Sequence, residues 1–167
     1  MRTRFDPGHG RWIPNCWLAR DTPQTIPDAT WTPVVWEFEV ISREVKPYPF
    51  WDLTVPHEFR LPFAGVYSGT ASIAWAENPH GVRRLRWCGQ FGTVVDENTF
   101  SYATDARAAT TNDAANGLAQ EIHGEPGGNA GERGSLYVYQ DSGGPLDLLP
   151  TGIVATPILT LVYMGSL

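Results

Sequence analysis

The sequence predicts an all-β sandwich or jelly roll, on the basis of three observations. With 167 residues the chain has the length of one domain and can bury a sizeable core. Its 17 glycines and 14 prolines, with only 18% of residues charged, favour short strands joined by turns. Apolar and polar residues alternate in short runs at intervals of about ten residues, and no long helical period is present, which argues against a parallel α/β sheet.

The individual strands follow from this alternation. The run 66–75 is the clearest, because Tyr67 and Trp75 belong to an inward apolar set that alternates with serines and threonines. Gly69 and Ala71 belong to the same set, and such small residues predict a close approach between two sheets. We expect roughly seven to nine strands, at 34–40, 59–63, 66–75, 83–88, 118–123, 136–140, 145–149 and 158–164.

Three segments carry more specific expectations. The segment 34–40 is expected as a half-buried strand, because four apolar residues alternate with polar ones. The alanine-rich segment 103–122 contains poor helix formers and is expected as a loop that leads into a strand. The segment 141–145 is expected as a tight hairpin turn, with its return strand at 145–149.

Residues 1–30 differ from the rest and are expected as an extended arm, with the jelly-roll domain at 31–167. They hold four prolines and show no period of two or of 3.6 residues. Ordering such a segment costs backbone entropy of roughly 1–2 kcal/mol per residue, so its apolar side chains need a surface to pack on. We expect the arm to dock on a partner or neighbouring subunit, with packing on its own domain as the alternative. The expected docking residues are Phe5, Trp12, Trp17 and Leu18.

Composition excludes several functions. The net charge of −6 argues against a general nucleic-acid binder, which needs a basic face. No apolar run suits a secretory signal or a bilayer span, so no membrane partner is expected. The four histidines lack metal-ligand spacing and no phosphate-binding glycine loop is recognisable, so we expect no metal and no cofactor. Cys16 and Cys88 are expected as buried thiols, although a single disulfide between them is also compatible with the sequence.

Arg83, Arg84 and Arg86 form a small basic patch. Such a run is ordinarily the charged outer face of a strand, or a set of arginines that pair with acids across a subunit interface. The functional alternative is a site for phosphate or for a carboxylate-bearing surface.

One motif points to catalysis. Asp141-Ser142-Gly143-Gly144 resembles the nucleophile segment of chymotrypsin-like serine proteases. On that interpretation His57, with Asp96 or Asp105, would complete a triad. Gln140 stands where that family has the glycine that shapes the oxyanion hole, and Ser-Gly-Gly is a favourable turn by itself. The turn is therefore favoured, and no catalytic residue is expected.

The stretch 59–67, Phe-Arg-Leu-Pro-Phe-Ala-Gly-Val-Tyr, resembles a hallmark of C1q/TNF-like jelly rolls. Weaker similarities extend the resemblance over about 25 to 167. The most similar members are C1q-like domains of tailed-bacteriophage virion proteins, which carry a short N-terminal arm. The resemblance implies a jelly-roll sandwich that forms a homotrimer through an aromatic and aliphatic interface. It assigns Tyr67, Trp75, Tyr137 and Tyr139 to the core or the trimer interface.

The resulting expectation is a non-enzymatic structural protein of a phage virion, attached to capsid or tail by its N-terminal arm and assembled in the host cytoplasm. It would decorate or stabilise the shell, or serve as a minor tail protein, in contact with other virion proteins. One alternative is a tail-fibre tip that binds a host glycan or protein receptor, which predicts exposed aromatic residues in the loops 79–82 and 104–117. The other is a serine protease that uses Ser142.

Overall fold

The computed structural model describes residues 15–42, 50–61, 65–91, 94–95, 107–108, 115–124, 132–150 and 158–165. Within these ranges the chain consists of strands and connections and contains no helix, and hence no helix that could cross a membrane. The strands are β1 (Asn15–Ala19), β2 (Gln24–Ile26), β3 (Thr32–Pro33), β4 (Phe38–Ser42), β5 (Phe59–Leu61), β6 (Gly65–Ala74), β7 (Val82–Phe91), β8 (Val94–Val95), β9 (Arg107–Ala108), β10 (Ala115–Gly124), β11 (Glu132–Gln140), β12 (Leu146–Leu148) and β13 (Ile158–Gly165).

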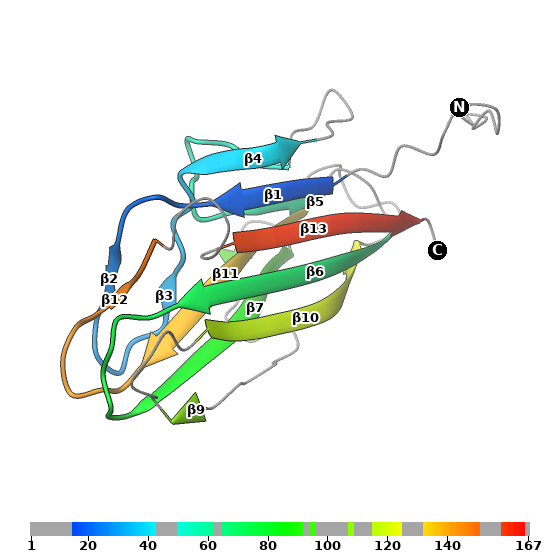
Figure 1. Cartoon of the computed structure of the whole chain (residues 1–167). Helices are drawn as coiled ribbons and strands as arrows, with labels where there is room; N and C mark the ends of the chain where they lie inside the picture. The colour runs from blue at the N-terminus through cyan, green and yellow to red at the C-terminus, as the bar shows by residue number, and fades with distance from the viewer. Residues whose placement is uncertain are drawn as a thin grey trace, which may run out of the picture.

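The strands form two antiparallel sheets that lie face to face (Figure 1). The five-stranded sheet has the order β10-β6-β13-β1-β4. The six-stranded sheet has the order β3-β11-β7-β8, with β5 also paired to β11 and β9 to β7. A separate ribbon pairs β12 with β2. Because most neighbouring strands are distant in sequence, the chain crosses repeatedly between the layers, as in a jelly roll.

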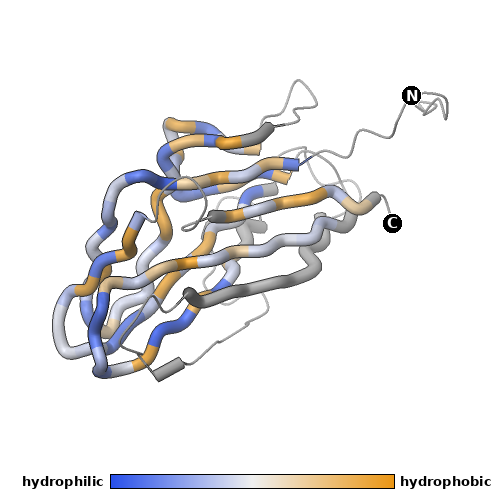
Figure 2. Tube along the Cα trace, viewed as in Figure 1, coloured by the Kyte–Doolittle hydropathy of each residue, from blue (hydrophilic) through white to orange (hydrophobic). Residues whose placement is uncertain are grey.

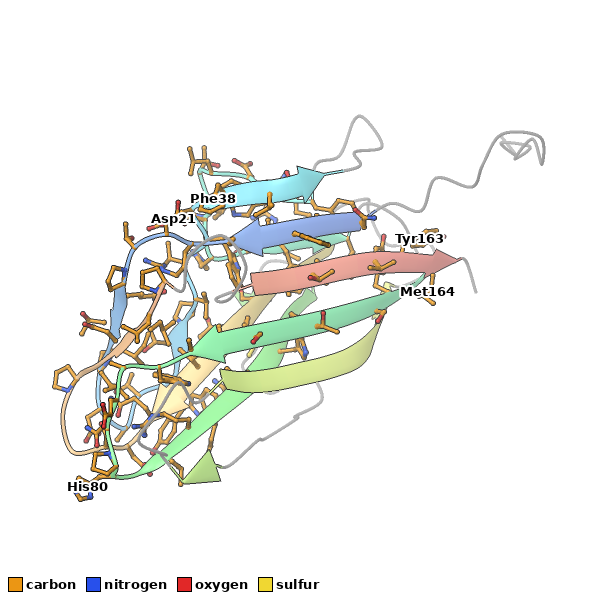
Figure 3. All side chains as sticks on the ribbon, viewed as in Figure 1. Asp21, Phe38, His80, Tyr163 and Met164 are labelled. Atoms are coloured by element: carbon orange, nitrogen blue, oxygen red, sulfur yellow. The ribbon has the colours of Figure 1, made fainter. Side chains whose placement is uncertain are left out.

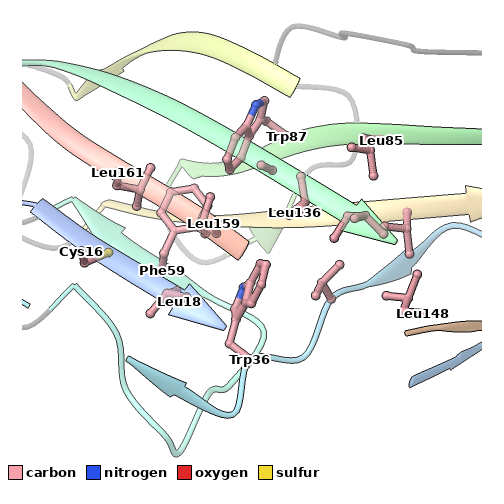
Figure 4. Packing of buried hydrophobic residues seen from close by; sticks show 14 of the residues in the cluster. Cys16, Leu18, Trp36, Phe59, Leu85, Trp87, Leu136, Leu148, Leu159 and Leu161 are labelled. Atoms are coloured by element: carbon pink, nitrogen blue, oxygen red, sulfur yellow. The ribbon is translucent and has the colours of Figure 1, made fainter. Parts of the chain in front are cut away.

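A hydrophobic core fills the space between the two sheets (Figure 4). Tyr67 and Leu159 enter it from the five-stranded sheet, and Leu85 and Leu136 from the six-stranded sheet, each with 0% exposure. This arrangement follows from the strand geometry, because successive side chains point to opposite faces. Burying a side chain of this size stabilises the fold by about 1.5–3 kcal/mol.

The strand expected at 66–75 is confirmed as β6, followed by an isolated bridge at Trp75. Gly69 and Ala71 belong to its buried set, whereas Ser68 and Thr70 are exposed. The closing strand is confirmed as β13, and the alanine-rich segment leads into β10 as expected. Local sequence patterns therefore predicted the long strands of the five-stranded sheet, β6 most clearly through its alternation.

The strand expected at 34–40 is wrong in its first half. Val34 and Trp36 are fully buried, as the alternation predicts, but no ladder includes 34–37 and β4 begins only at Phe38. The Arg20 guanidinium donates a hydrogen bond to the Val35 carbonyl oxygen and so takes up one of the groups that a neighbouring strand would need. A buried side chain thus replaces sheet pairing at this point.

The outward position of Val40 is a second difference. The sequence predicts it on the inward face, but Val40 is 49% exposed. In the pairing of β4 with β1, Ile41 lies opposite Trp17 and Glu39 lies opposite Leu18, so Val40 is the extra residue of a β-bulge and is left out of the ladder.

The turn at 141–145 is present, but the expected hairpin is not. β12 pairs with β2, with Leu146 opposite Ile26, instead of returning along β11. The side chain of Gln140 accounts for this, because its Nε2 donates to the carbonyl oxygens of Ile26 at 3.1 Å and Gly144 at 2.9 Å. These bonds tie the chain after the turn to β2.

The expected arm is described only from Asn15 onward, and from there it belongs to the sandwich. β1 pairs with both β13 and β4, and β2 pairs with β12. Cys16 and Leu18 have 0% exposure, so Leu18 is a core residue and not a free docking residue. Only five residues carry this alternation, too few to stand out beside the prolines. Phe5 and Trp12 lie outside the described residues.

Cys16 and Cys88 are both free and buried, so the disulfide that the sequence allowed is not formed. Burial raises the pKa of the Cys16 thiol well above its usual value, and the charge of Glu39 adds to this, whereas a hydrogen bond with the Leu161 backbone acts in the opposite direction. A protonated thiol in this position behaves as a small apolar core residue.

Candidate binding surfaces

The outer face of the five-stranded sheet is uncharged over its three central strands. β1, β6 and β13 contain no Asp, Glu, Lys, Arg or His residue. Since the inward residues of each strand fill the core, the outward residues form the surface layer of the sheet. A solvated sheet face ordinarily carries charged side chains, so this face has the composition of a subunit interface.

Apolar side chains are exposed on this face. Trp17 of β1 is 39% exposed, and Met164, at the end of β13, is 66% exposed (Figure 3). Trp17 lies opposite Thr160, and Thr160 lies opposite Thr70, so an uncharged row crosses three adjacent strands. Figure 2 shows that hydrophobic residues are concentrated along β13, in the middle of this sheet.

The outer face of the six-stranded sheet has a different chemistry. Arg86 of β7 pairs in register with Tyr137 of β11, and Arg84 pairs with Tyr139. Directly opposed residues of an antiparallel pair have their side chains on the same face. Trp31, which directly precedes β3, packs with these side chains. We refer to these five residues as the Arg–aromatic ladder.

Rings and guanidinium groups lie in sequence along the ladder. The Cζ atom of Arg86 is 4.1 Å from the ring centroid of Trp31 and 5.4 Å from that of Tyr137. The rings of Trp31 and Tyr139 are 5.3 Å apart, and the Cζ atom of Arg84 is 5.2 Å from the Tyr139 ring. Each cation–π contact at such distances contributes about 0.5–2 kcal/mol. The contacts therefore join the five side chains in one continuous, packed array.

The two arginines of the ladder differ in exposure. Arg86 lies between two rings and is 5% exposed, whereas Arg84, at the end of the array, is half-buried. The Nε atom of Arg84 is buried and has no hydrogen-bond partner, and Arg84 takes part in no ion pair within the part of the chain that the structure describes. Arg84 thus presents a positive charge that no carboxylate of the described residues neutralises.

Arg83, the third arginine of the sequence patch, points into the protein and is 1% exposed. It donates hydrogen bonds to the carbonyl oxygens of His80 at 3.1 Å and Asn78 at 3.4 Å. Burial lowers the pKa of Arg83, and the charge of Asp141 partly opposes this shift. The expected patch is therefore divided, because Arg83 holds the turn before β7 and only the other two arginines share the outer face.

The residues expected in the core or at a trimer interface also divide into two groups. Tyr67 and Trp75 are 0% and 2% exposed and belong to the core. Tyr137 and Tyr139 are half-buried members of the Arg–aromatic ladder. Neither pair lies on the uncharged face of the five-stranded sheet.

Ser142 lies in a turn that the Gln140 side chain holds. The hydroxyl oxygen of Ser142 is 2.6 Å from Gln140 Oε1 and 3.3 Å from the Gly144 carbonyl oxygen, and both of these atoms are acceptors. The Oδ1 atom of Asp141 accepts a hydrogen bond from the backbone N–H of Val82. Among the described residues no imidazole bonds to Ser142, so its hydroxyl donates to neutral acceptors and not to a base.

His57 lies far from Ser142 along the sheet. Phe59, two residues after His57, pairs with Gly134 in β11. Gln140 lies six positions beyond Gly134 along the extended strand, a distance of about 20 Å. This geometry does not support a triad of the chymotrypsin type.

The described residues contain no group of three or more His, Cys, Asp or Glu side chains that could hold a metal ion. The imidazole of His57 lies 3.9 Å from the Glu58 carboxylate, and His80 is exposed in the turn before β7 (Figure 3). Asp96 and Asp105, the other candidates for a triad, lie outside the described residues.

The sequence did not predict the Arg–aromatic ladder, although part of the signal is present. Arg84 and Arg86 are two residues apart in one expected strand, and Tyr137 and Tyr139 are two residues apart in another. Whether these two strands are neighbours is a long-range property that alternation does not encode. Trp31 has no such pattern around it.

No family model matches the sequence, and no curated protein matches it. Several solved structures are similar in fold. A TNF structure, Eiger from S. frugiperda, is 17% identical with a TM-score of 0.58, covering 94% of this chain and 96% of that chain. Murine APRIL at pH 5.0 is 14% identical with a TM-score of 0.58, covering 92% of this chain and 100% of that chain. The protein therefore has a C1q/TNF-like jelly-roll fold, in agreement with the expectation from 59–67.

Proposed function

We propose that the protein is a non-enzymatic structural component of a phage virion that forms a homotrimer through the outer face of its five-stranded sheet. The uncharged surface of β1, β6 and β13, with Trp17 and Met164 exposed, is the observation that carries this proposal. Exposed apolar surface of this kind is ordinarily covered by another subunit. The resemblance to C1q/TNF-like domains implies three copies, which a closed rotational symmetry accommodates.

Attachment to the particle is assigned to residues 1–14. Phe5 and Trp12 are the docking residues in this segment, whereas Leu18 stabilises the core and Trp17 belongs to the subunit interface. The location in a virion is supported by the resemblance to phage jelly rolls that carry a short N-terminal arm. Attached in this way, the protein would decorate or stabilise a capsid or serve as a minor tail protein.

The absence of catalysis is supported by the turn around Ser142. Its hydroxyl bonds to the Gln140 amide oxygen, which is too weak a base to activate a nucleophile. The protease alternative therefore has no geometric support among the described residues.

The proposed homotrimer is tested by measuring the oligomeric state of the purified protein. Light scattering on the purified full chain is expected to give the mass of three chains. Met164→Glu introduces a charge into the proposed interface and is expected to shift the mass towards one chain. Leu53→Glu is the matched control, because Leu53 is 68% exposed, close to the 66% of Met164, but lies outside the five-stranded sheet. A monomeric wild-type protein, or equal effects of the two variants, would contradict the proposed interface.

The virion location is tested on particles. Mass spectrometry of purified particles from the phage whose genome encodes the chain should detect it, and immunogold labelling should place it on head or tail. Particles that lack the chain, or an encoding gene outside any phage genome, would refute this part of the proposal.

Recognition of a host surface is a second candidate function, and the Arg–aromatic ladder favours it. The sequence led us to expect exposed aromatic residues in the loops 79–82 and 104–117. Neither loop contains a Phe, Tyr or Trp residue, so this expectation is wrong. The ladder provides aromatic groups on the sheet that the proposed subunit contact leaves uncovered.

A further inference from the structure

We infer that the Arg–aromatic ladder binds an acidic saccharide, with Arg84 as the residue that takes the carboxylate of the sugar. The inference concerns the outer face of the six-stranded sheet, and it does not depend on subunit contacts through the other sheet.

The charge of Arg84 is the first argument. A half-buried guanidinium next to a ring has lost part of its hydration, and no ion pair of the described residues compensates for it. The Nε atom is buried and lacks a hydrogen-bond partner, so a ligand would be bound by the two terminal nitrogens of the guanidinium group. A planar guanidinium matches a carboxylate through two parallel hydrogen bonds.

The packing of the array is the second argument. Arg84 stacks on Tyr139, which packs against Trp31, which in turn covers Arg86. An arginine that is held in place before binding loses less side-chain entropy when the ligand arrives. Stacking on Tyr139 therefore restricts the orientation of Arg84, which favours a specific anion site.

The rings favour a sugar over an acidic peptide. Tyr139 and Tyr137 are only half-buried and combine an apolar ring with a polar hydroxyl group. A saccharide offers the matching pair of surfaces, C–H groups on the face of its ring and hydroxyls at its edge. An acidic peptide would use the arginines and leave the rings without a role. Jelly rolls are also a common scaffold for lectins.

The net charge of the protein determines the ionic strength at which binding should be measured. Because the chain carries a net charge of −6, a polyanion is repelled over the surface as a whole. Binding to an acidic sugar therefore has to come from local contacts, and it should be measured at physiological ionic strength, where long-range effects are screened.

The experiment uses the full chain on an array of sialylated and uronate-containing oligosaccharides, each beside its neutral counterpart, with oligoglutamate peptides on the same array. Wild-type protein is expected to bind acidic members and not their neutral counterparts. Arg84→Gln should weaken this binding at least about tenfold, the loss typical of one charge-assisted bidentate pair. Arg84→Lys keeps the charge but lacks the planar guanidinium group, so it should give an intermediate loss of binding.

Arg60→Gln is the matched control, because it removes the same charge from an arginine that is ion-paired with Asp52 at 2.9 Å and lies outside the ladder. It should retain binding within about twofold of the wild type. Equal losses in Arg84→Gln and Arg60→Gln would show a bulk charge effect and overturn the inference. No preference for acidic over neutral sugars would also overturn it. Tighter binding of oligoglutamate with the same dependence on Arg84 would replace the saccharide with an acidic protein partner.

Discussion

Gly81 packs so closely against Asp141 that a Cβ atom on Gly81 would lie 2.3 Å from the Asp141 carbonyl oxygen. Gly81 closes the turn before β7 with a φ of 74°, and Asp141 directly follows β11. β7 and β11 are neighbours in the six-stranded sheet, so this contact sets how their two turns meet. The Asp141 side chain strengthens the junction by accepting a hydrogen bond from the Val82 N–H.

Gly81→Ala is accordingly expected to destabilise the protein by about 2–5 kcal/mol. One part of this cost comes from placing alanine in a left-handed backbone conformation, and the other from the clash of its Cβ atom with the backbone of Asp141. Gly143→Ala is the matched control, because Gly143 has a φ of 90° but an added Cβ meets nothing within 4 Å. It should cost only the backbone term of about 1–2 kcal/mol. Urea unfolding of both variants measures the difference, and equal losses would argue against the close approach of Gly81 to Asp141.

Gln140→Glu should destabilise the protein by about 3 kcal/mol, although the two side chains have the same shape. Gln140 has 0% exposure, and its Nε2 donates to the carbonyl oxygens of Ile26 and Gly144. A carboxylate cannot donate to these oxygens and would be buried next to them. Ser142→Ala, which removes one donor from the same turn, should cost only about 1 kcal/mol. If thermal melts rank these two variants the other way round, Gln140 does not anchor the turn.

A fluorophosphonate probe is expected to leave Ser142 unlabelled. The probe reacts with serines that a nearby base activates, and the hydroxyl of Ser142 donates instead to an amide oxygen at 2.6 Å. Intact-mass spectrometry after long incubation provides the measurement. Stoichiometric labelling that disappears in Ser142→Ala would show that the protein is an enzyme.

The Glu37 carboxylate should make stability depend on pH. Desolvation raises its pKa, but hydrogen bonds from the Thr22 hydroxyl and from the backbone N–H groups of Asp21 and Thr22, with the charge of Arg20, outweigh this and hold the pKa below its usual value of 4.5. The unfolded chain therefore takes up the proton at higher pH than the folded protein does. The contribution of Glu37 is complete above its unfolded pKa and is lost as the pH falls through the lower folded pKa.

Glu37→Gln should thus flatten the decline in stability between about pH 5 and pH 3. Asp52→Asn serves as a comparison. The pKa of Asp52 is also lowered, mainly by hydrogen bonds from Thr54, and its side chain is 33% exposed, close to the 29% of Glu37. Its effect should be smaller because, besides the arginine paired with each carboxylate, only Thr54 among the described residues donates hydrogen bonds to Asp52, whereas the Thr22 hydroxyl and two backbone N–H groups donate to Glu37. Denaturant midpoints of the wild type and both variants, measured across this pH range, show which substitution has the larger effect. A larger effect of Asp52→Asn than of Glu37→Gln would contradict the prediction.

Two truncations separate the arm from the sandwich. Removal of 1–14 is expected to leave a folded domain with an unchanged oligomeric state and to abolish attachment to the particle. Removal of 1–30 should prevent folding, because it deletes β1, which lies between β13 and β4 and buries Leu18. Circular dichroism and light scattering report the fold and the mass. A folded product of the longer truncation would mean that β1 is dispensable.

The parts of the fold that the sequence predicted are those that local patterns determine. In β6 the alternation runs through ten residues, and the buried positions from Tyr67 to Ile73 follow it. The turn at 141–145 could be predicted because its two glycines accept unusual backbone angles, and Gly143 does have a φ of 90°. Such features need no knowledge of the remainder of the chain.

The features that escaped prediction depend on contacts between distant segments. β1 was missed because its period-two pattern spans five residues next to prolines, and its pairing with β13 joins Trp17 to Thr160. The pairing of β12 with β2 depends on the buried amide of Gln140, which looks like any other polar residue in the sequence. The ladder likewise required the register that sets Arg84 against Tyr139.

The position of β13 between β6 and β1 has a consequence for biosynthesis. Without it, the five-stranded sheet consists of two separate pairs, β10 with β6 and β1 with β4. β13 is the last of these strands to leave the ribosome. Until residues 158–165 emerge, β6 and β1 each have one unpaired strand edge. Closure of the sheet therefore has to follow the synthesis of β13, and nascent chains that stall before β13 should be prone to aggregation.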